Sequence, residues 1–308
     1  MARRRRGQPV HGWVVIDKPS GVSSAQAVAT VRRVFDAAKA GHAGTLDPLA
    51  TGILPVALGE ATKTVPYVMD ATKDYDFTIE WGVARSTDDR EGAVSATSAV
   101  RPDVEAIRAA TRRFVGVIEQ VPPAYSAVKV DGERAYDLAR SGEEVDLEPR
   151  RIEILGFELA EMVDADHARF LVSSGKGAYM RALARDLADS LGTVGHIVAL
   201  RRLRVGPFPE SAAISLDSLA GLMHNPAALE HLRPVETALD GIPALALNGP
   251  EAKTLRNGQG VPVFRSMDRD RFGHLREGDL VYAREGEVPV AIARIEGGAI
   301  RPVRVLNL

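Results

Sequence analysis

The chain has 308 residues, of which 45% are hydrophobic and 26% charged, and its formal net charge is −2. These proportions are typical of globular proteins and exclude disordered, collagen-like and coiled-coil chains. The length suits one large domain with a smaller second one, and the net charge taken by itself argues against a nucleic-acid partner.

The charges are distributed unevenly along the chain. Residues 169–204 contain seven Lys or Arg against two Asp, whereas residues 131–148 contain seven acidic residues against two Arg. Because phosphates respond to the local electric field, 169–204 is a candidate contact for nucleic acid. Two solvated faces of opposite charge explain the same pattern, so charge alone leaves both interpretations open.

The composition also limits the chemistry and the compartment. The chain contains no cysteine, which excludes disulfides, a thiolate nucleophile and cysteine-bound zinc or iron–sulfur clusters. No apolar stretch has the length of a signal-peptide core or the about 20 residues of a membrane helix. We therefore expect a soluble, cytoplasmic protein without membrane contact.

The first quarter of the chain predicts a strand, a helix and a long loop. Residues 13–16 are apolar and predict a short strand, after which Ser23 or Ser24 caps a helix with apolar residues at helical spacing. A loop is expected over 41–51, and the apolar run 52–58 follows it.

The middle of the chain holds the clearest strand. Asp74–Gly82 alternates strictly, with Tyr75 and every second residue after it apolar. Residues 102–115 predict a helix, and two consecutive prolines then open a long polar segment over about 121–151.

The residue pattern changes within the last third of the chain. Residues 170–174 predict a strand, and a helix with leucines at helical spacing is expected around 183–191. The Gly-Pro-Phe-Pro sequence at 206–209 predicts the start of an irregular connector. From about residue 243, short Val-rich runs separated by glycines predict a small β-domain.

Common catalytic motifs do not occur. The sequence has no Gly-x-x-x-x-Gly-Lys-Ser/Thr, no His-Glu-x-x-His and no Gly-x-Ser-x-Gly, and its seven histidines are scattered. The sequence therefore gives no support for a metal, a nucleotide or another cofactor, and we expect none.

The segment Gly41–Gly52 places a single carboxylate on a constrained loop. Pro48 keeps the backbone of Asp47 out of the helical region, and Leu46 and Leu49 flank it. An aspartate is ordinarily ionised at neutral pH, and a partly desolvated carboxylate can act as nucleophile or base. Because Asp-Pro also begins many ordinary turns, the dipeptide by itself does not identify a catalytic group.

The longer string Gly41–Lys63 resembles the catalytic segment of the TruB family, the bacterial tRNA pseudouridine synthases. Other segments resemble further motifs of that family in the same order: Asp17–Ser24, Val121–Lys129, Gly175–Arg181 and Gly195–Arg202. Order and spacing agree from about residue 12 to 208, which is too long a match to arise by chance.

The resemblance implies a reaction. Enzymes of this family convert one uridine in the T-loop of tRNA, position 55 in tRNA numbering, to pseudouridine without metal or cofactor. The nucleotide flips out of the stack, and its base is detached, rotated and rejoined through C5. Asp47 is implied as the essential carboxylate, which attacks C1′ of the ribose or removes a ribose proton, and the sequence leaves both routes open.

The resemblance also implies which residues surround the uracil. Tyr75 matches the tyrosine that stacks on the flipped base and is placed to move the C5 proton, and Arg181 matches the arginine that pairs with the carboxylate. Tyr179 and Leu200 match residues that line the uracil pocket. From the pattern alone, Tyr75 is better explained as a core residue and Leu200 equally well so, while Arg181 is also explained as a surface residue of an amphipathic helix.

Contacts with the rest of the RNA are implied by the same match. His42 matches a histidine that contacts RNA near the flipped nucleotide. Lys18, Lys63 and Arg201–Arg202 are candidate phosphate contacts. The basic arm Arg3–Arg6 either contacts RNA or forms a free tail.

The implied fold is α+β, the pseudouridine synthase fold with a mixed, largely antiparallel sheet flanked by helices. We expect a catalytic domain over 1–242 with an RNA-clasping insertion at about 121–151, and a small β-rich PUA-like RNA-binding domain over 243–308. The middle of the insertion is acidic, so its basic ends at Lys129 and Arg150–Arg151 are the better candidates for phosphate contacts.

We expect a monomer that acts on the T-arm of tRNA without an obligatory protein partner. A first alternative is the catalytic subunit of a guide-RNA complex, which would not modify bare tRNA. A second is a tRNA-folding chaperone. A third is a glycoside hydrolase that pairs Asp47 with a second carboxylate such as Asp186 and releases free uracil or sugar.

Overall fold

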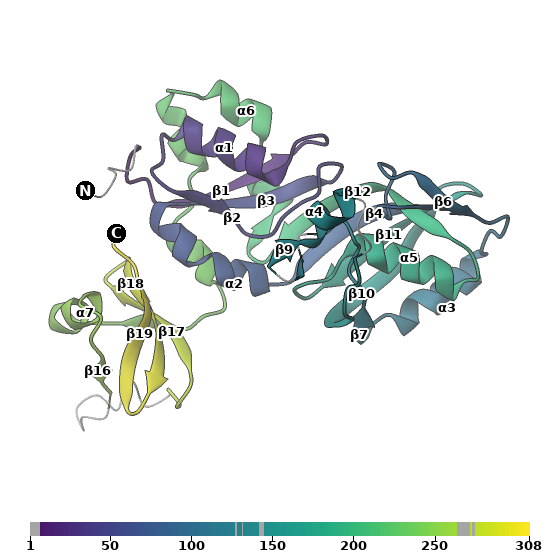
Figure 1. Ribbon diagram of the computed structural model, residues 1–308. Helices are drawn as coiled ribbons and strands as arrows, with labels where there is room; N and C mark the ends of the chain where they lie inside the picture. Colours follow the sequence, from purple (N-terminus) through teal and green to yellow (C-terminus); the bar gives the residue numbers. More distant parts are fainter. Residues whose placement is uncertain (1–6, 127, 131, 142–144, 264–271, 273–274) are drawn as a thin grey trace.

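The computed structural model describes residues 7–126, 128–130, 132–141, 145–263, 272 and 275–308. Its main sheet has ten strands (Figure 1), which are β1 (Gly12–Lys18), β2 (Ala40–His42), β3 (Thr51–Leu58), β4 (Lys73–Trp81), β7 (Gly116–Gln120), β10 (Arg150–Met162), β11 (His167–Ser174), β12 (Gly195–Val205), β13 (Phe208–Pro209) and β14 (Ile214–Ser215). The Arg3–Arg6 arm lies outside the described residues.

The main sheet is mixed and largely antiparallel. Its strand order is β14-β1-β3-β12-β4-β11-β10-β7, with β2 added beside β3 and β13 beside β12. β3 and β12 run parallel, with Thr51 opposite Arg201, and β1 and β14 are also parallel. The predicted α+β fold is confirmed, and the β3–β12 junction brings the loop that precedes β3 next to the middle of β12.

The helices lie against this sheet or its extensions. They are α1 (Ser24–Val34), α2 (Val65–Asp70), α3 (Val104–Arg113), α4 (Ala135–Arg140), α5 (Met180–Ser190), α6 (Leu216–Gly221) and α7 (Gly249–Arg256). Short 3-10 turns are η1 (Gly59–Lys63), η2 (Glu210–Ala212), η3 (Pro226–His231) and η4 (Val235–Leu239). α1 and α6 pack beside β1, whereas α3 and α5 cover the half built from β4, β10 and β12 (Figure 1).

The alternation predicted for β4 is present. Tyr75, Phe77, Ile79 and Trp81 are all buried, and the ring of Phe77 stacks on Phe170 of β11 with centroids 5.6 Å apart. Full burial of such a side chain stabilises the fold by about 1.5–3 kcal/mol. This apolar face therefore fixes β4 in the centre of the sheet. Some side chains of β4 can then extend past the core towards a site.

The predicted start of α1 is also confirmed. Ser23 is the N-cap, and its hydroxyl accepts from the backbone of Gln26 while the Gln26 side chain accepts from the backbone of Ser23. This reciprocal arrangement satisfies two amide groups that a helix start otherwise leaves without partners.

Two parts of the chain differ from what the sequence predicts. β12 was not predicted although it is central, because its charged residues break the apolar pattern on which a strand prediction depends. The expected irregular connector after 206–209 is instead structured, since β14 joins the sheet beside β1 and α6 packs on α1. Buried Leu219 and Leu216 explain why this segment is fixed.

The C-terminal residues form a second sheet with its own apolar core, drawn in yellow-green in Figure 1. Its order is β15-β17-β18-β19-β16, and the bounds are β15 (Ala244–Ala246), β16 (Val261–Pro262), β17 (Leu280–Glu285), β18 (Val288–Glu296) and β19 (Ala299–Val305). Leu306 leaves this sheet and packs among buried residues of the first one, including Trp13. The chain end therefore fastens the two parts together.

Two hairpins lie outside these sheets in the part of the chain that the structure describes. One is formed by β5 (Val83–Arg85) and β6 (Val94–Thr97), and the other, within the predicted insertion, by β8 (Lys129–Val130) and β9 (Glu133–Arg134). The insertion buries Val128, Ala135 and Leu147 against the ring of Tyr179. No helix among the described residues is long and apolar enough to cross a membrane.

Candidate active site

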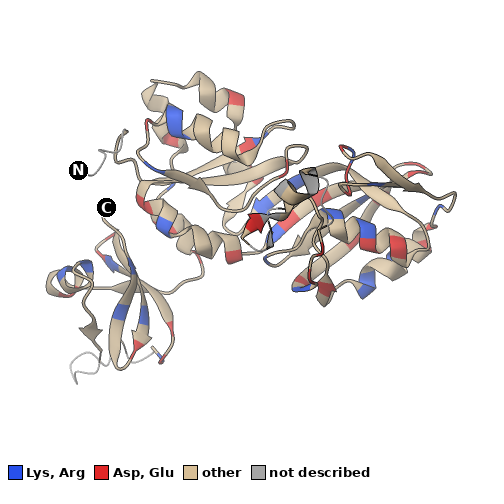
Figure 2. Cartoon of the chain, viewed as in Figure 1, with Lys and Arg blue, Asp and Glu red and all other residues tan. Residues whose placement is uncertain are grey.

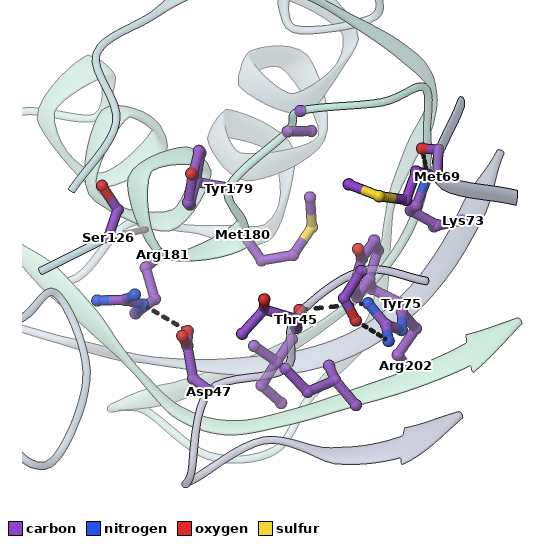
Figure 3. Close-up of a pocket in the computed structure, with 15 residues that line it drawn as sticks. Thr45, Asp47, Met69, Lys73, Tyr75, Ser126, Tyr179, Met180, Arg181 and Arg202 are labelled. Carbon is purple, nitrogen blue, oxygen red and sulfur yellow. Dashed lines mark hydrogen bonds and ion pairs between the residues drawn. The ribbon is translucent and has the colours of Figure 1, made fainter. Parts of the chain in front are cut away.

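A pocket of about 290 Å³ opens where the loop before β3 meets β4, β12 and the start of α5. Five of the eight predicted site residues line it: Asp47, Tyr75, Tyr179, Arg181 and Leu200. The first four of these are labelled in Figure 3. The other lining residues are Gly44, Thr45, Leu46, Met69, Lys73, Ser126, Gly177, Ala178, Met180 and Arg202. One carboxylate, that of Asp47, is thus enclosed by mainly apolar and aromatic walls.

Lys18 supports the loop that carries Asp47. The Lys18 side chain is 0% exposed, and its Nζ donates to the carbonyl oxygens of Pro19, Val22 and Pro48 at 2.8, 2.7 and 3.2 Å. All three N–H groups of the ammonium are therefore used within the protein. This corrects the phosphate contact predicted for Lys18, which instead fixes the backbone next to Asp47.

Ser24 holds the other side of the same loop. Its hydroxyl accepts from the backbone N–H of Leu46 at 2.8 Å and donates to the Leu46 carbonyl at 2.9 Å. The carbonyl of Asp47 accepts from the N–H of Ala50 at 3.1 Å, which closes a turn. Residues on both sides of Asp47 are thus fixed before any substrate binds.

Arg202 joins β12 to the loop. Its Nε donates to the carbonyl of Ile53 at 2.8 Å, and its terminal nitrogens donate to the carbonyls of Gly44 and Thr45 at 3.0 and 3.4 Å (Figure 3). Burial lowers the pKa of Arg202, and Tyr75 and Asp47 oppose that shift. The phosphate contact predicted for Arg202 is corrected, because the guanidinium is enclosed beneath the pocket.

The central interaction is the ion pair between Arg181 and Asp47. Arg181 Nε donates to Asp47 Oδ2 at 2.9 Å, while its other two nitrogens donate to the carbonyls of Thr87 and Tyr125, each at 2.8 Å. The buried carboxylate of Asp89 lies 3.6 Å from Nε. The Arg181 side chain is 4% exposed and that of Asp47 35%, so the arginine is fixed and the carboxylate faces the opening.

The walls of the pocket are apolar and aromatic. Tyr75 and Leu200 are each 8% exposed and also belong to the core of the main sheet, so the core and pocket interpretations both hold for them. Burial raises the pKa of Tyr179, whose hydroxyl is therefore neutral at physiological pH. Met69 and Met180 complete the lining (Figure 3). A flat heterocycle would meet ring faces and thioethers here.

Lys73 is the main pocket residue that the sequence prediction missed. Its Nζ donates to the carbonyls of Met69 and Ala71 at 2.6 and 2.5 Å, and burial lowers its pKa to about 8. The signal was present, since Lys73 stands two residues before Tyr75 and side chains at that spacing share one face of a strand.

His42 lies on β2, opposite Val56 of β3, and is not among the residues that line the pocket. Burial lowers its pKa, and the charge of Arg202 adds to the shift, so the ring is neutral at pH 7. Its Nδ1 is buried and has no hydrogen-bond partner among the described residues. The RNA contact inferred for His42 stays a prediction.

Lys63 and Arg201 are engaged in contacts away from the pocket. Lys63 Nζ donates to Glu60 at 2.6 Å and to the carbonyl of Val305 at 2.8 Å, which connects the main sheet to the C-terminal strand. Arg201 forms a two-point pair with Asp17, both distances being 3.0 Å. The side chains of Lys63 and Arg201 are 28% and 36% exposed, and the phosphate contacts inferred for them stay predictions.

A second catalytic carboxylate at Asp186 is not supported. Asp186 pairs with Arg185 on α5 at 2.9 Å and does not line the pocket. Glycosidases place two carboxyl groups on either side of the bond that breaks. The lining of this pocket contains one, at Asp47, so the hydrolase alternative lacks its second group.

The fold and this site together define a class of protein, the pseudouridine synthases. The family model described as the TruB family pseudouridylate synthase N-terminal domain matches residues 32–180, and that of the tRNA pseudouridylate synthase B C-terminal domain matches 181–240. The chain belongs to the TruB family, and its enzyme class is that of the tRNA pseudouridine synthases.

Curated relatives match over the full length. The chain is 55% identical over 308 residues to tRNA pseudouridine synthase B of Rhodospirillum rubrum, with 100% of both chains covered. It is 50% identical over 309 residues to the protein of that name from Caulobacter vibrioides, again with 100% of both covered.

Solved structures share the fold. A chain of a Cbf5–Nop10–Gar1 complex has a TM-score of 0.74 and 25% identity, covering 96% of this chain and 85% of that one. A chain of an H/ACA RNP bound to a substrate RNA containing 2′-deoxyuridine also has a TM-score of 0.74, with 22% identity and 100% and 92% coverage. The second likeness shows the fold alone.

Proposed function

We propose that this enzyme isomerises uridine 55 in the T-loop of tRNA, after that nucleotide flips out of the RNA stack into the pocket. The observation that carries the proposal is the Arg181–Asp47 ion pair, which holds one carboxylate at the opening of a pocket floored by Tyr75. Sequestering a flipped base in a pocket is how enzymes reach atoms that a nucleic-acid stack conceals.

The carboxylate geometry suits attack on the sugar. Oδ2 of Asp47 is bound by Arg181, whereas Oδ1 has no hydrogen-bond partner in the part of the chain that the structure describes. Oδ1 either attacks C1′ or removes a ribose proton, and the C1′–N1 bond breaks in both routes. The uracil then rotates and C5 bonds to C1′. In the first route the bond between Asp47 Oδ1 and C1′ breaks in that step, and in the second route the abstracted proton returns from Asp47 to the ribose. The C5 proton leaves and N1 is protonated, so substrate and product are isomers.

Tyr75 is placed to receive the base. The tyrosine lies at the pocket end of the apolar face of β4 and lines the cavity. Stacking of a base on an aromatic ring is worth about 1–3 kcal/mol, which offsets much of the few kcal/mol required to unstack a nucleotide. We propose that its hydroxyl also accepts or relays the C5 proton.

We propose that the C-terminal sheet, within 243–308, is a PUA-like domain that binds the remainder of the tRNA. Lys and Arg positions are coloured blue on its strands (Figure 2), and Arg294, Arg301 and Arg304 are exposed. Burial raises the pKa of Tyr67 in α2, and the charges of Arg304 and Arg294 oppose that rise, so these arginines lie near α2. Because Met69 of α2 lines the pocket, phosphates bound there would lead towards the active site.

The insertion supplies a second contact. Arg150 and Arg151 lie at the end of the insertion, are exposed, and are the first two residues of β10. The side chain of Lys129 lies outside the described residues. We propose that these basic ends clasp the T-arm, and that residues 1–242 form the catalytic domain. A tRNA substrate also supports the cytoplasmic location expected from the sequence.

The test is tritium release from C5-labelled uridine in a purified, unmodified tRNA, comparing the wild type with Asp47→Asn. A neutral amide can neither attack the sugar nor act as a base, so release should be abolished while tRNA binding persists. Asp103→Asn is the matched control, since Asp103 caps α3 and Asn caps a helix equally well.

Other outcomes would contradict particular parts of the proposal. Turnover by Asp47→Asn at the wild-type rate would exclude Asp47 from the chemistry. Release of free uracil would indicate hydrolysis. Failure of the wild type on bare tRNA would favour a guide-RNA complex, and label release that persists when uridine 55 is replaced would exclude that position.

A further inference from the structure

Gln120 clamps the backbone of a single pocket residue. It is the last residue of β7, and its side chain is enclosed, with the residue 2% exposed. Its Oε1 accepts from the backbone N–H of Tyr179 at 2.9 Å, and its Nε2 donates to the Tyr179 carbonyl at 3.1 Å. One amide side chain therefore bonds to both backbone polar groups of Tyr179, and the Tyr179 carbonyl also accepts from the Leu183 N–H of α5 at 3.0 Å.

The clamped residue is the start of α5. Tyr179 is the N-cap of that helix and provides no side-chain cap of its own. The first turn of a helix has amide groups without intrahelical partners and is its least constrained part. Arg181 belongs to this turn, so its direction depends on how the start of α5 is held.

Two further bonds tie the same segment to α5. Arg185 donates to the carbonyl of Val121 at 2.9 Å, and Arg181 donates to the carbonyl of Tyr125 at 2.8 Å. The segment from Gln120 to Tyr125 is the beginning of the insertion. The base of the insertion is therefore fastened along the helix that carries the arginine paired with Asp47.

We propose that Gln120 is a positioning residue for the isomerisation, because its amide holds the start of α5 so that Arg181 keeps Asp47 directed into the pocket. This inference rests on the pseudouridine synthase activity of the site. Both hydrogen bonds between Gln120 and Tyr179 involve the Tyr179 backbone, so Gln120 acts on orientation and not on tRNA affinity. Removing the clamp should slow the chemical step and leave binding unchanged.

The variant that separates this role from general structural support is Gln120→Glu. Its carboxylate can accept from the Tyr179 N–H but faces the Tyr179 carbonyl with no proton to donate. The protonated carboxyl restores both bonds, since it has one donor and one acceptor. Arg150, opposite Gln120 on β10, and Arg181 on α5 both favour the ionised form, so the acid measurements extend to pH 5.

The experiment measures single-turnover tritium release from tRNA between pH 8 and pH 5, each variant divided by the wild type at the same pH. We expect Gln120→Glu to be about tenfold slower at pH 8, as for the loss of a buried hydrogen bond, and its ratio to rise at least threefold by pH 5. Gln120→Met, which can form neither bond, should be slower by a similar factor at every pH. Dissociation constants for tRNA should stay within twofold.

The matched control is Gln26→Glu, the same substitution at the exposed third residue of α1, where Glu serves the capping arrangement as well as Gln. Its ratio to the wild type should be one at every pH. A wild-type rate for Gln120→Glu at pH 8, or a reduced ratio that does not rise with acid, would overturn the proposal. If Gln120→Met does not fold, the pH dependence of the Gln120→Glu rate still tests the proposal. A wild type inactive on tRNA would contradict the proposed substrate instead.

Discussion

Replacing Arg181 with lysine tests the ion pair at the centre of the site. The guanidinium uses three nitrogens to reach Asp47, Thr87 and Tyr125 at 2.8–2.9 Å. A lysine keeps the positive charge but places it on one nitrogen, which cannot occupy the three positions of the planar fork. The substitution therefore separates the charge of Arg181 from its geometry.

The magnitude follows from the bonds that are lost. A hydrogen bond that involves a charged group contributes about 1.5–3 kcal/mol. If lysine satisfies the two carbonyls, the orienting bond to Asp47 is lost, and the single-turnover rate should fall by about 10- to 150-fold. Affinity for tRNA should change little, because Arg181 is 4% exposed and bound within the protein.

The assay is tritium release under single-turnover conditions, with filter binding for affinity and thermal unfolding to confirm the fold. Arg169→Lys is the matched control, since Arg169 forms a two-point pair with Asp76 and does not line the pocket. That variant should keep its rate. A folded Arg181→Lys protein within threefold of the wild-type rate would refute the argument that arginine geometry directs Asp47.

Two further predictions concern stability. His196 is fully buried and accepts from Arg85 at 3.2 Å, and burial lowers its pKa below the ordinary value of 6.5. Because the unfolded chain then binds a proton that the folded chain does not, the free energy of unfolding should fall as the pH drops below 6.5. Urea titrations of His196→Gln should show a shallower decline of that free energy with falling pH. Gly52 has φ +96°, and a Cβ there would lie 2.2 Å from the carbonyl oxygen of Arg202, so Gly52→Ala should destabilise by at least about 3 kcal/mol. Gly192→Ala, with φ +70° and open space around it, should cost only about 1–2 kcal/mol in the same unfolding assay, and equal losses for the two would contradict the steric explanation.

Local patterns predicted the elements that depend on local physics. The alternation from Tyr75 to Trp81 required a buried strand face, and the strand has that face. Ser23 and Gln26 can satisfy a helix start without help from distant residues, and they do so. By contrast, a search for apolar patterns does not find β12 because the strand is rich in charges, and Arg202 can be buried there because carbonyls of another segment accept its hydrogen bonds.

The charged residues show the same limit. Lysines and arginines are usually solvated, so the sequence suggests phosphate contacts for Lys18 and Arg202. Both are instead buried and bound to backbone carbonyls of the protein. A sequence shows that a cation is present, but whether water, RNA or a carbonyl surrounds it depends on segments far away along the chain.

By itself, the sequence determined the family, and it predicted the carboxylate of the site and the residues expected near it, because the motifs preserve residue type and order along one chain. Only the tertiary structure decided which of these residues meet. Asp47 and Arg181 are 134 positions apart, and their contact exists because β3 pairs in parallel with β12 and because Gln120 fixes the start of α5. Distances between such segments depend on sheet order and buried polar contacts, which local preferences along the chain do not specify.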